Sequence, residues 1–352
     1  MREEEHHLGR IVLFGSGETS ASGRAVHDRL MAQLQPPIVV AILETPAGFQ
    51  PNSEHVAHEV GEFFRARLRN YHPDVRIIHA RKKGTRFSPN DPTLLEPMLD
   101  ANYLFLGPGS PTYAVRNLEG TLALKYLKEL HKAGAVLCLA SAAALTAGAK
   151  VLPVYEIFKA GSDLYWADGL NIFGLFGLEL AVVPHWNNTE GGVKLDTSRC
   201  FMGRRRMSRL ERLLPASTVM LGMDEHTALI FDFGEGQALV LGRGTITIKS
   251  RAGQTAYSAG QSFPLTELGP YQLPPLAPPK LPSRARRQEP RSELAEPPPE
   301  VARLIGLREQ ARRVGDWARA DALRQQIVDM GFDIQDTPEG PHWWHGHDRD
   351  RA

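Results

Sequence analysis

Ser141 is the residue whose surroundings first suggest chemistry. It follows an apolar, partly β-branched run at 135–139, typical of a strand buried on both faces, and precedes an alanine-rich segment that favours a helix. A hydroxyl at a sharp strand-to-helix turn projects above the sheet edge, where the N–H groups of the first helical turn point to the same place. This is the setting that a serine nucleophile needs. The same pattern also fits a close-packed helix that Ser141 merely caps.

Alternating strands and helices must position this serine. Each apolar run ends in a loop rich in glycine, proline or hydroxyl side chains and leads into a helical stretch, which is typical of parallel α/β units. Four or five such units predict an α/β fold, with a doubly wound, mostly parallel sheet and helices on both faces. After residue 150 the pattern changes, and three runs predict a terminal antiparallel section. The expected parallel strands are 10–14, 38–43, 75–79, 103–106 and 135–139, and the antiparallel ones are 227–233, 237–241 and 244–248.

Two loops at the expected carboxyl edge of the sheet are rich in glycine. The loop 107–113 could present the N–H of Gly109 or Ser110 to a developing oxyanion, although an ordinary turn with Ser110 as helix cap has the same spacing. The Gly-x-Gly at Gly15 and Gly17 lacks the third glycine of a dinucleotide-binding loop. This makes the loop a weak dinucleotide signal, and we predict no cofactor and no metal.

Composition limits the class of protein. A chain of 352 residues is expected to hold about two domains, and 41 basic against 40 acidic residues create no global field toward nucleic acid or membrane. Its two cysteines do not make a disulfide framework, which fits a reducing compartment. The N-terminus lacks the apolar core of a signal peptide, and the longest apolar run is shorter than the roughly 20 residues that span a bilayer. We expect a soluble, cytoplasmic protein that does not enter a membrane.

The sequence contains the motifs Leu139-Ala-Ser-Ala-Ala-Ala144, Val183-Pro-His-Trp186 and Met223-Asp-Glu-His-Thr-Ala228. Together they resemble the cyanophycinase and aspartyl dipeptidase family of serine peptidases. Leu139-Ala-Ser-Ala-Ala-Ala144 stands where the family has Gly-Thr-Ser-Ala-Gly-Ala. Val183-Pro-His-Trp186 is similar to the Asn-Pro-His-Phe of the dipeptidase branch, and Met223-Asp-Glu-His-Thr-Ala228 is similar to Ile-Asp-Glu-Asn-Thr-Ala. The likeness covers about residues 8–250.

The resemblance implies a fold like that of class I glutamine amidotransferases and the hydrolysis of a small peptide or amide. It makes Ser141 the nucleophile, His185 the general base and Glu225 the acid of the triad. The N–H groups of Gly109 and Ala142 would form the oxyanion hole.

This sequence departs from the family at several positions. The glycines that flank the family's nucleophile are replaced by Leu139 and Ala143, in a turn that leaves little room for side chains. Cys200 stands where the motif His-Phe-x-x-Arg-x-Arg-x-x-Arg-Leu of the cyanophycinase branch begins with histidine, which leaves His185 as the base. If His185 is instead held by backbone contacts, the domain is a degenerate amidotransferase-like binding protein.

Two further features have simpler interpretations. Cys138 invites comparison with the cysteine nucleophile of amidotransferases, but its position inside the expected strand favours a buried apolar role. The arginines of segment 204–212 could hold an acidic ligand, whereas such a run more often forms the solvated face of a helix.

The C-terminal part has a different composition. Residues 263–299 are dense in proline and are expected to form an extended linker after a domain at 1–262. Helices are predicted at 300–314 and 317–330, and a short hairpin at 332–344. The helical module would then occupy 300–345, with a disordered tail at 346–352.

This module contains the motifs Ala320-Asp-Ala-Leu-Arg324 and Asp336-Thr-Pro-Glu-Gly-Pro-His-Trp343. Through these motifs, about residues 300–344 resemble the C-terminal domain of cysteinyl-tRNA synthetase. The resemblance implies a tRNA contact, although a helical hairpin reused for protein packing would have the same sequence features. The chain lacks the His-Ile-Gly-His and Lys-Met-Ser-Lys-Ser signatures, so we do not expect aminoacylation. The candidate RNA-contacting residues are Arg308, Arg312, Arg313, Arg319 and Arg324.

Overall fold

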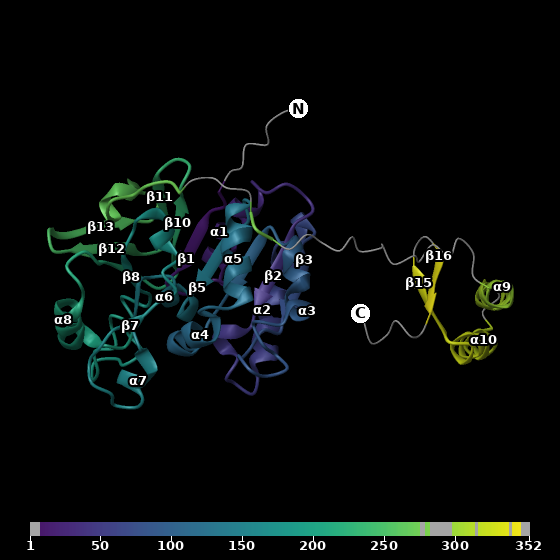
Figure 1. Cartoon of the computed structure of the whole chain (residues 1–352). Helices are drawn as coiled ribbons and strands as arrows, with labels where there is room; N and C mark the ends of the chain where they lie inside the picture. The colour runs from purple at the N-terminus through teal and green to yellow at the C-terminus, as the bar shows by residue number, and fades with distance from the viewer. Residues whose placement is uncertain (1–7, 275–278, 282–297, 314–315, 338–339, 346–352) are drawn as a thin grey trace. The chain divides into compact units, whose positions relative to one another are not determined.

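The computed structural model describes residues 8–274, 279–281, 298–313, 316–337 and 340–345 (Figure 1). The chain divides into two compact units, Met1–Leu281 and Pro282–Ala352. Within the described residues no helix is long and apolar enough to cross a membrane.

An eight-stranded mixed sheet forms the centre of the first unit (Figure 1). Its strands, in order across the sheet, are β14 (Ser262–Pro264), β11 (Gln237–Gly242), β10 (Thr227–Asp232), β1 (Ile11–Phe14), β5 (Val136–Ala140), β4 (Tyr103–Leu106), β2 (Val39–Leu43) and β3 (Asp74–Ile78). The five neighbouring strands β1, β5, β4, β2 and β3 pair in parallel. Strands β10, β11 and β14 continue the sheet in antiparallel pairing. The predicted α/β fold, with a mostly parallel sheet and an antiparallel section, is confirmed.

A second, six-stranded sheet belongs to the same unit. Its order is β13 (Gly253–Ser258), β12 (Thr245–Ser250), β9 (Val219–Met223), β8 (Leu180–Val183), β6 (Lys150–Val151) and β7 (Ala167–Asp168). The sequence did not predict this separate sheet, because two of its strands have only two residues and the segment containing them is irregular in pattern. Its parallel pair β8 and β9 ends at the two loops that carry His185 and Glu225.

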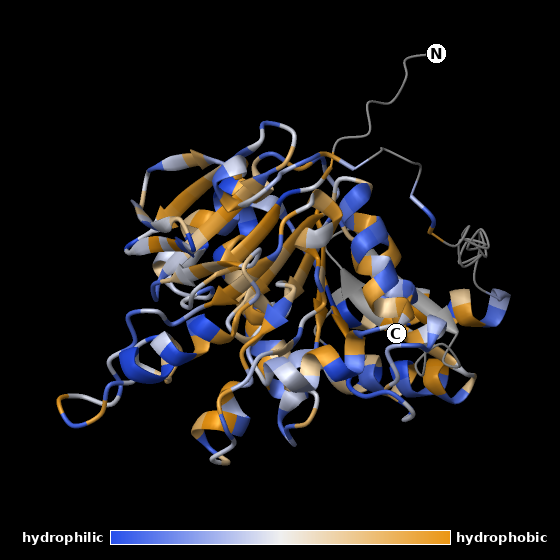
Figure 2. Cartoon of the chain, turned by 60° about the vertical axis from the view of Figure 1, so that its left-hand side comes forward, coloured by the Kyte–Doolittle hydropathy of each residue, from blue (hydrophilic) through white to orange (hydrophobic). Residues whose placement is uncertain are grey.

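Helices pack on both faces of the large sheet. Alternate residues of β1 enter different cores, since Leu13 belongs to one apolar cluster and Val12 to the other. Figure 2 shows the apolar strands in the interior, and helices that carry both polar and apolar residues. The helices are α1 (Ala21–Met31), α2 (Ser53–Arg67), α3 (Pro92–Leu95), α4 (Pro111–Leu118), α5 (Leu122–Lys132), α6 (Ala142–Thr146), α7 (Val154–Phe158) and α8 (Gly203–Leu213), with short 3₁₀ turns η1 (Thr45–Ala47), η2 (Arg69–Tyr71), η3 (Glu96–Asp100), η4 (Phe173–Phe176) and η5 (Leu265–Leu268).

The expected start of the linker at residue 263 needs correction. Phe263 of β14 pairs with Ala238 of β11, and Phe263, Leu265 and Leu268 are buried in the core of the first unit. Proline at a sheet edge costs no ladder hydrogen bond, so Pro264 is compatible with this strand. The proline-dense segment therefore begins later, and much of it lies outside the described residues.

The second unit has a small core of its own. Helices α9 (Pro299–Arg313) and α10 (Trp317–Asp329) form the predicted helical pair, and β15 (Phe332–Thr337) and β16 (Gly340–His345) form an antiparallel hairpin. Val301, Leu304 and Ile327 are among the buried residues that hold it together. The expected tail at 346–352 lies outside the described residues.

The buried ring of His131 makes stability depend on pH. It lies edge-on to Phe176 and Phe233, with ring centroids 6.0 and 5.8 Å away. Burial lowers its pKa from 6.5 to about 4. Between these two pH values the unfolded chain therefore binds a proton on His131 that the folded chain does not. The contribution of neutral His131 to the free energy of unfolding is complete above pH 6.5 and is lost as the pH falls toward 4.

We expect replacement of His131 by leucine to remove this acid sensitivity. The free energy of unfolding that wild type loses through His131 is about 3 kcal/mol, because each pKa unit corresponds to about 1.4 kcal/mol. The measurement is the free energy of unfolding in urea at neutral and at mildly acidic pH, for wild type and His131→Leu. The buried His27, whose pKa is also lowered by burial to about 4, stays in both proteins as an internal control. An equal loss of stability in the two proteins would contradict this assignment.

Candidate active site

Ser141 lies on a tight turn between β5 and α6. Its backbone has φ 51° and ψ −112°, a left-handed conformation that a residue other than glycine rarely adopts. Its N–H donates to the carbonyl of Phe14, at the end of the neighbouring strand β1, over 3.2 Å. Such strain persists only where surrounding structure holds it, and it is concentrated at functional sites.

The two departures from glycine beside this turn are accommodated. Leu139 lies within β5 opposite Leu13 and Leu106, and only 1% of it is exposed. Ala143 is fully buried in α6. Leu139 therefore fills the core below the sheet edge, and the turn at Ser141 forms above it.

His185 lies within hydrogen-bond distance of both expected partners. Its Nε2 is 3.0 Å from Ser141 Oγ, and its Nδ1 is 2.9 Å from Glu225 Oε1. Because a carboxylate only accepts, Nδ1 carries the proton and Nε2 is free to accept the serine hydroxyl. The His185 backbone N–H also donates to the carbonyl of Gly15 over 3.2 Å, which ties the base to the loop after β1.

Two asparagines that the sequence analysis did not single out support Glu225. Asn188 Nδ2 donates to Glu225 Oε1 over 3.0 Å, and the Glu225 backbone N–H donates to Asn187 Oδ1 over 2.8 Å. Burial alone would raise the pKa of Glu225, but the hydrogen bonds from Asn188 and His185 outweigh it and lower the pKa below its usual value. The carboxylate is thus ionised at neutral pH. The available signal was the position of both asparagines directly after the histidine motif.

A strained turn holds the loop of His185. Arg199, Cys200 and Phe201 all have positive φ, at 59°, 56° and 66°. The Cys200 N–H donates to the carbonyl of His185 over 3.1 Å, and the Arg199 guanidinium donates to the carbonyl of Trp186 over 2.7 Å while stacking 3.9 Å above its ring. These contacts fix the backbone from which the imidazole projects.

Neither cysteine has the character of a nucleophile. Cys200 is buried, and burial raises its thiol pKa to about 12. Cys138 is fully buried within β5, and burial raises its pKa even further. Both therefore remain protonated thiols at neutral pH.

The loop before α4 carries Gly109 and Ser110, the two candidate backbone donors to an oxyanion. The Ser110 N–H donates to the carbonyl of Pro46 over 2.9 Å, and Ser110 Oγ caps α4 by accepting from the Tyr113 N–H over 3.3 Å. Ser110 is therefore the helix cap, and of the two expected amides only that of Gly109 is left for a ligand. Gly109 has φ 150°, and a Cβ there would lie 1.9 Å from the carbonyl oxygen of Pro46, so only glycine fits. Helix α4 packs on α6, whose first N–H belongs to Ala142.

The arginine run lies on α8 with an amphipathic pattern. Met207 and Leu210 are buried, whereas Arg206 donates to the carbonyls of Met202 and Phe201 over 2.8 and 3.1 Å. The remaining arginines of this run are exposed, as expected for the solvated face of a helix: Arg204, Arg205, Arg209 and Arg212.

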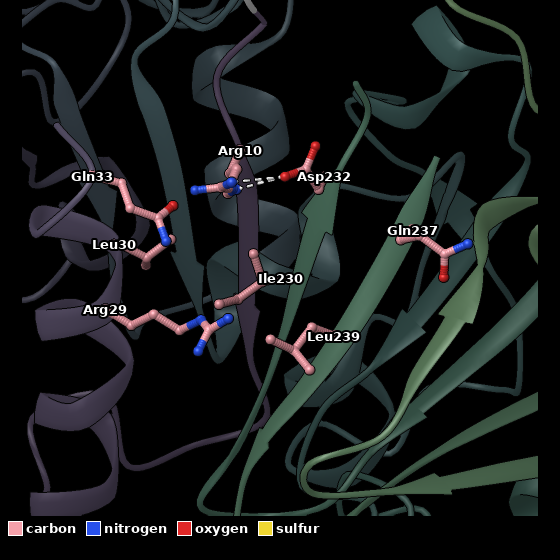
Figure 3. A pocket seen from close by; sticks show the side chains of 8 residues that line it. All are labelled: Arg10, Arg29, Leu30, Gln33, Ile230, Asp232, Gln237 and Leu239. Atoms are coloured by element: carbon pink, nitrogen blue, oxygen red, sulfur yellow. Dashed lines mark hydrogen bonds and ion pairs between the residues drawn. The ribbon is translucent and has the colours of Figure 1, made fainter. Parts of the chain in front are cut away.

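A separate pocket of about 90 Å³ lies at the N-terminal end of β1 (Figure 3). Arg10, directly before this strand, donates to Asp232 over 2.9 and 2.8 Å, and Arg29 lies near Ile230. Ser141 follows the carboxyl end of β5, which is parallel to β1. The pocket is thus at the opposite edge of the sheet and takes no part in the arrangement around Ser141.

The candidate arginines of the second unit differ in exposure. Arg308 is only 3% exposed and pairs with Glu309 over 3.0 Å. Arg312 is half-buried with its guanidinium 5.8 Å from the ring of Trp317, while Arg319 and Arg324 are exposed. The side chain of Arg313 lies outside the described residues.

Each of the two units is similar to known proteins, the first in structure and the second in sequence. A peptidase from an acI-B1 Actinobacterium has a similar structure, with a TM-score of 0.58 and 21% sequence identity, covering 74% of this chain and 98% of that one. Together with the strand order, this similarity confirms the predicted class I glutamine amidotransferase-like fold of the first unit.

The C-terminal module matches a known domain by sequence. Residues 294–343 match the family described as the cysteinyl-tRNA ligase anticodon binding domain. Cysteine–tRNA ligase of Methanosarcina mazei is 50% identical over 46 residues, and that of Desulfovibrio desulfuricans is 51% identical over 45 residues. Each match covers 13% of this chain, and only 10% and 9% of the two ligases.

Proposed function

We propose that the first unit is a serine-type hydrolase that cleaves a small peptide or amide. The main support is the chain of hydrogen bonds from Ser141 Oγ to His185 Nε2, and from His185 Nδ1 to Glu225, with 3.0 and 2.9 Å between the atoms. A serine hydroxyl is a weak nucleophile at its own pKa and needs such a base. A degenerate binding domain would have no need to keep Ser141 in a strained conformation with its hydroxyl on an imidazole.

The reaction follows from these positions. Ser141 Oγ attacks the substrate carbonyl as its proton passes to His185 Nε2, and Glu225 stabilises the resulting imidazolium. The N–H groups of Gly109 and Ala142 donate to the oxyanion of the tetrahedral intermediate. His185 then protonates the leaving amine, and water hydrolyses the acyl-enzyme by the same base.

The experiment is a hydrolysis assay on a panel of dipeptides and amino-acid amides, including substrates with acidic, basic and apolar N-terminal residues. Release of amine from at least one member by the wild-type protein is expected. A folded protein that releases amine from none of them would contradict the proposal and favour the binding-domain alternative.

A second proposed function concerns the C-terminal module, which we propose contacts tRNA. The match of residues 294–343 to an anticodon-binding domain supports it, as do the exposed guanidinium groups of Arg319 and Arg324. Arg312 is a further candidate, whereas the buried Arg308 has a structural role. Full-length protein should retard tRNA with an affinity that falls steeply with salt, and deletion of 282–352 should weaken this binding strongly. Equal binding by the deletion variant, or no binding by the full chain, would refute it.

A further inference from the structure

A groove with a lysine wall lies on the first unit, away from Ser141. It has a volume of about 680 Å³ and runs along α5, where Lys125, Lys128 and Lys132 line it. Residues spaced by three and four positions share one face of a helix, so these side chains form a stripe about 10 Å long. Asn90 and Asn171 add polar side chains to the lining.

The charge of this lysine groove is only partly balanced. Lys132 pairs with Glu129 over 2.9 Å, but within the described parts of the chain no acidic side chain pairs with Lys125 or Lys128. Lys128 is half-buried, and burial together with the neighbouring charge of Lys132 lowers its pKa. Its ammonium is thus poorly solvated and near a like charge, so a bound anion would stabilise both lysines.

The connection to the C-terminal module starts at the same helix. The backbone N–H of Lys280 donates to Glu129 Oε2 over 2.6 Å, and Leu281, the last residue of the first unit, packs on its core. The chain therefore leaves the first unit beside the lysine groove and continues into the module that matches an anticodon-binding domain. An RNA held by that module is tethered to the unit that carries the groove.

We propose that the lysine groove binds the phosphate backbone of the RNA that the C-terminal module engages. This inference rests on the proposed tRNA contact and is independent of the hydrolase. Ammonium groups on flexible stems suit backbone phosphates, which carry no sequence information, so the groove contributes affinity and the module contributes selectivity. A second, tethered contact raises the affinity of the whole chain above that of the module alone.

The test compares two full-length variants of equal net charge. In the first, Lys125, Lys128 and Lys132 become glutamate, and in the control Lys194, Arg243 and Arg251, which are exposed elsewhere on the first unit, become glutamate. Binding of labelled tRNA is measured by anisotropy over a series of salt concentrations. The groove variant should bind at least tenfold more weakly than the control, with a salt slope smaller by about two to three.

The proposal is contradicted if the groove variant binds tRNA with the affinity and the salt slope of the control. The milder variant Lys125→Gln, Lys128→Gln, Lys132→Gln must weaken binding in the same direction, which separates loss of contact from unfolding. If wild-type protein fails to bind tRNA, the tRNA proposal and the groove fall together. If a polyglutamate peptide competes no less well than RNA, the groove binds acidic protein instead, and the proposal is refuted.

Discussion

Replacing Ser141 by alanine is expected to lower kcat/KM for the hydrolysed substrate by about 10⁴-fold or more, because the acyl-enzyme forms on its Oγ. The fold should survive, since the change removes only one hydroxyl, whose hydrogen bond is to His185. Initial rates of amine release and the thermal midpoint are measured for wild type and Ser141→Ala. Ser162→Ala, at an exposed position, is the matched control and should keep full activity.

One result would contradict the assignment of Ser141 as the nucleophile. If Ser141→Ala keeps more than about one hundredth of the wild-type rate, water or another side chain attacks the substrate, and the nucleophile has been assigned wrongly.

Glu225→Gln is expected to lower kcat by about 10³ to 10⁴-fold. The side chain keeps its shape, but it loses the charge that stabilises the imidazolium, and its amide can donate to His185 Nδ1 and so select the wrong tautomer. Asn188 Nδ2 donates to the same oxygen, Oε1, as His185 Nδ1, and the uncharged amide oxygen of glutamine is a weaker acceptor for both donors than the carboxylate. The control is Glu235→Gln, on an exposed turn.

Single-turnover rates of acylation and the free energy of unfolding should be measured together for Glu225→Gln. A large loss of rate with little loss of stability is the expected result. If Glu225→Gln acylates as fast as Glu235→Gln, the carboxylate does not orient the base, and another acid must be sought.

The loop positions of the three candidate site residues were predictable because each follows a strand. Ser141 comes after β5, His185 after β8 and Glu225 after β9, so the ends of short apolar runs place all three side chains in loops. Since β8 and β9 are parallel neighbours, their loops lie at one edge of the six-stranded sheet, whereas Ser141 follows a strand of the eight-stranded sheet. The geometry that joins the three residues still had to come from the structure.

The features of the site that the sequence could not predict are set by the backbone conformation of long loops. The left-handed turn at Arg199, Cys200 and Phe201 contains no proline or glycine within those three residues that would signal it. The support of Glu225 by Asn188 spans 37 positions in the chain, and no local pattern encodes it. The proline density after residue 262 predicts the end of the core there, but Phe263 pairs with Ala238 of β11, so the core extends further.

The most direct test of the proposed active site is the mass of the intact protein after treatment with a fluorophosphonate. An activated serine forms a covalent phosphonyl ester, with fluoride as the leaving group and the proton taken up by the base. We expect one adduct per chain, located on Ser141 by peptide mapping, and no adduct in Ser141→Ala. Wild-type protein that keeps its unmodified mass, or an adduct on a different residue, would contradict it.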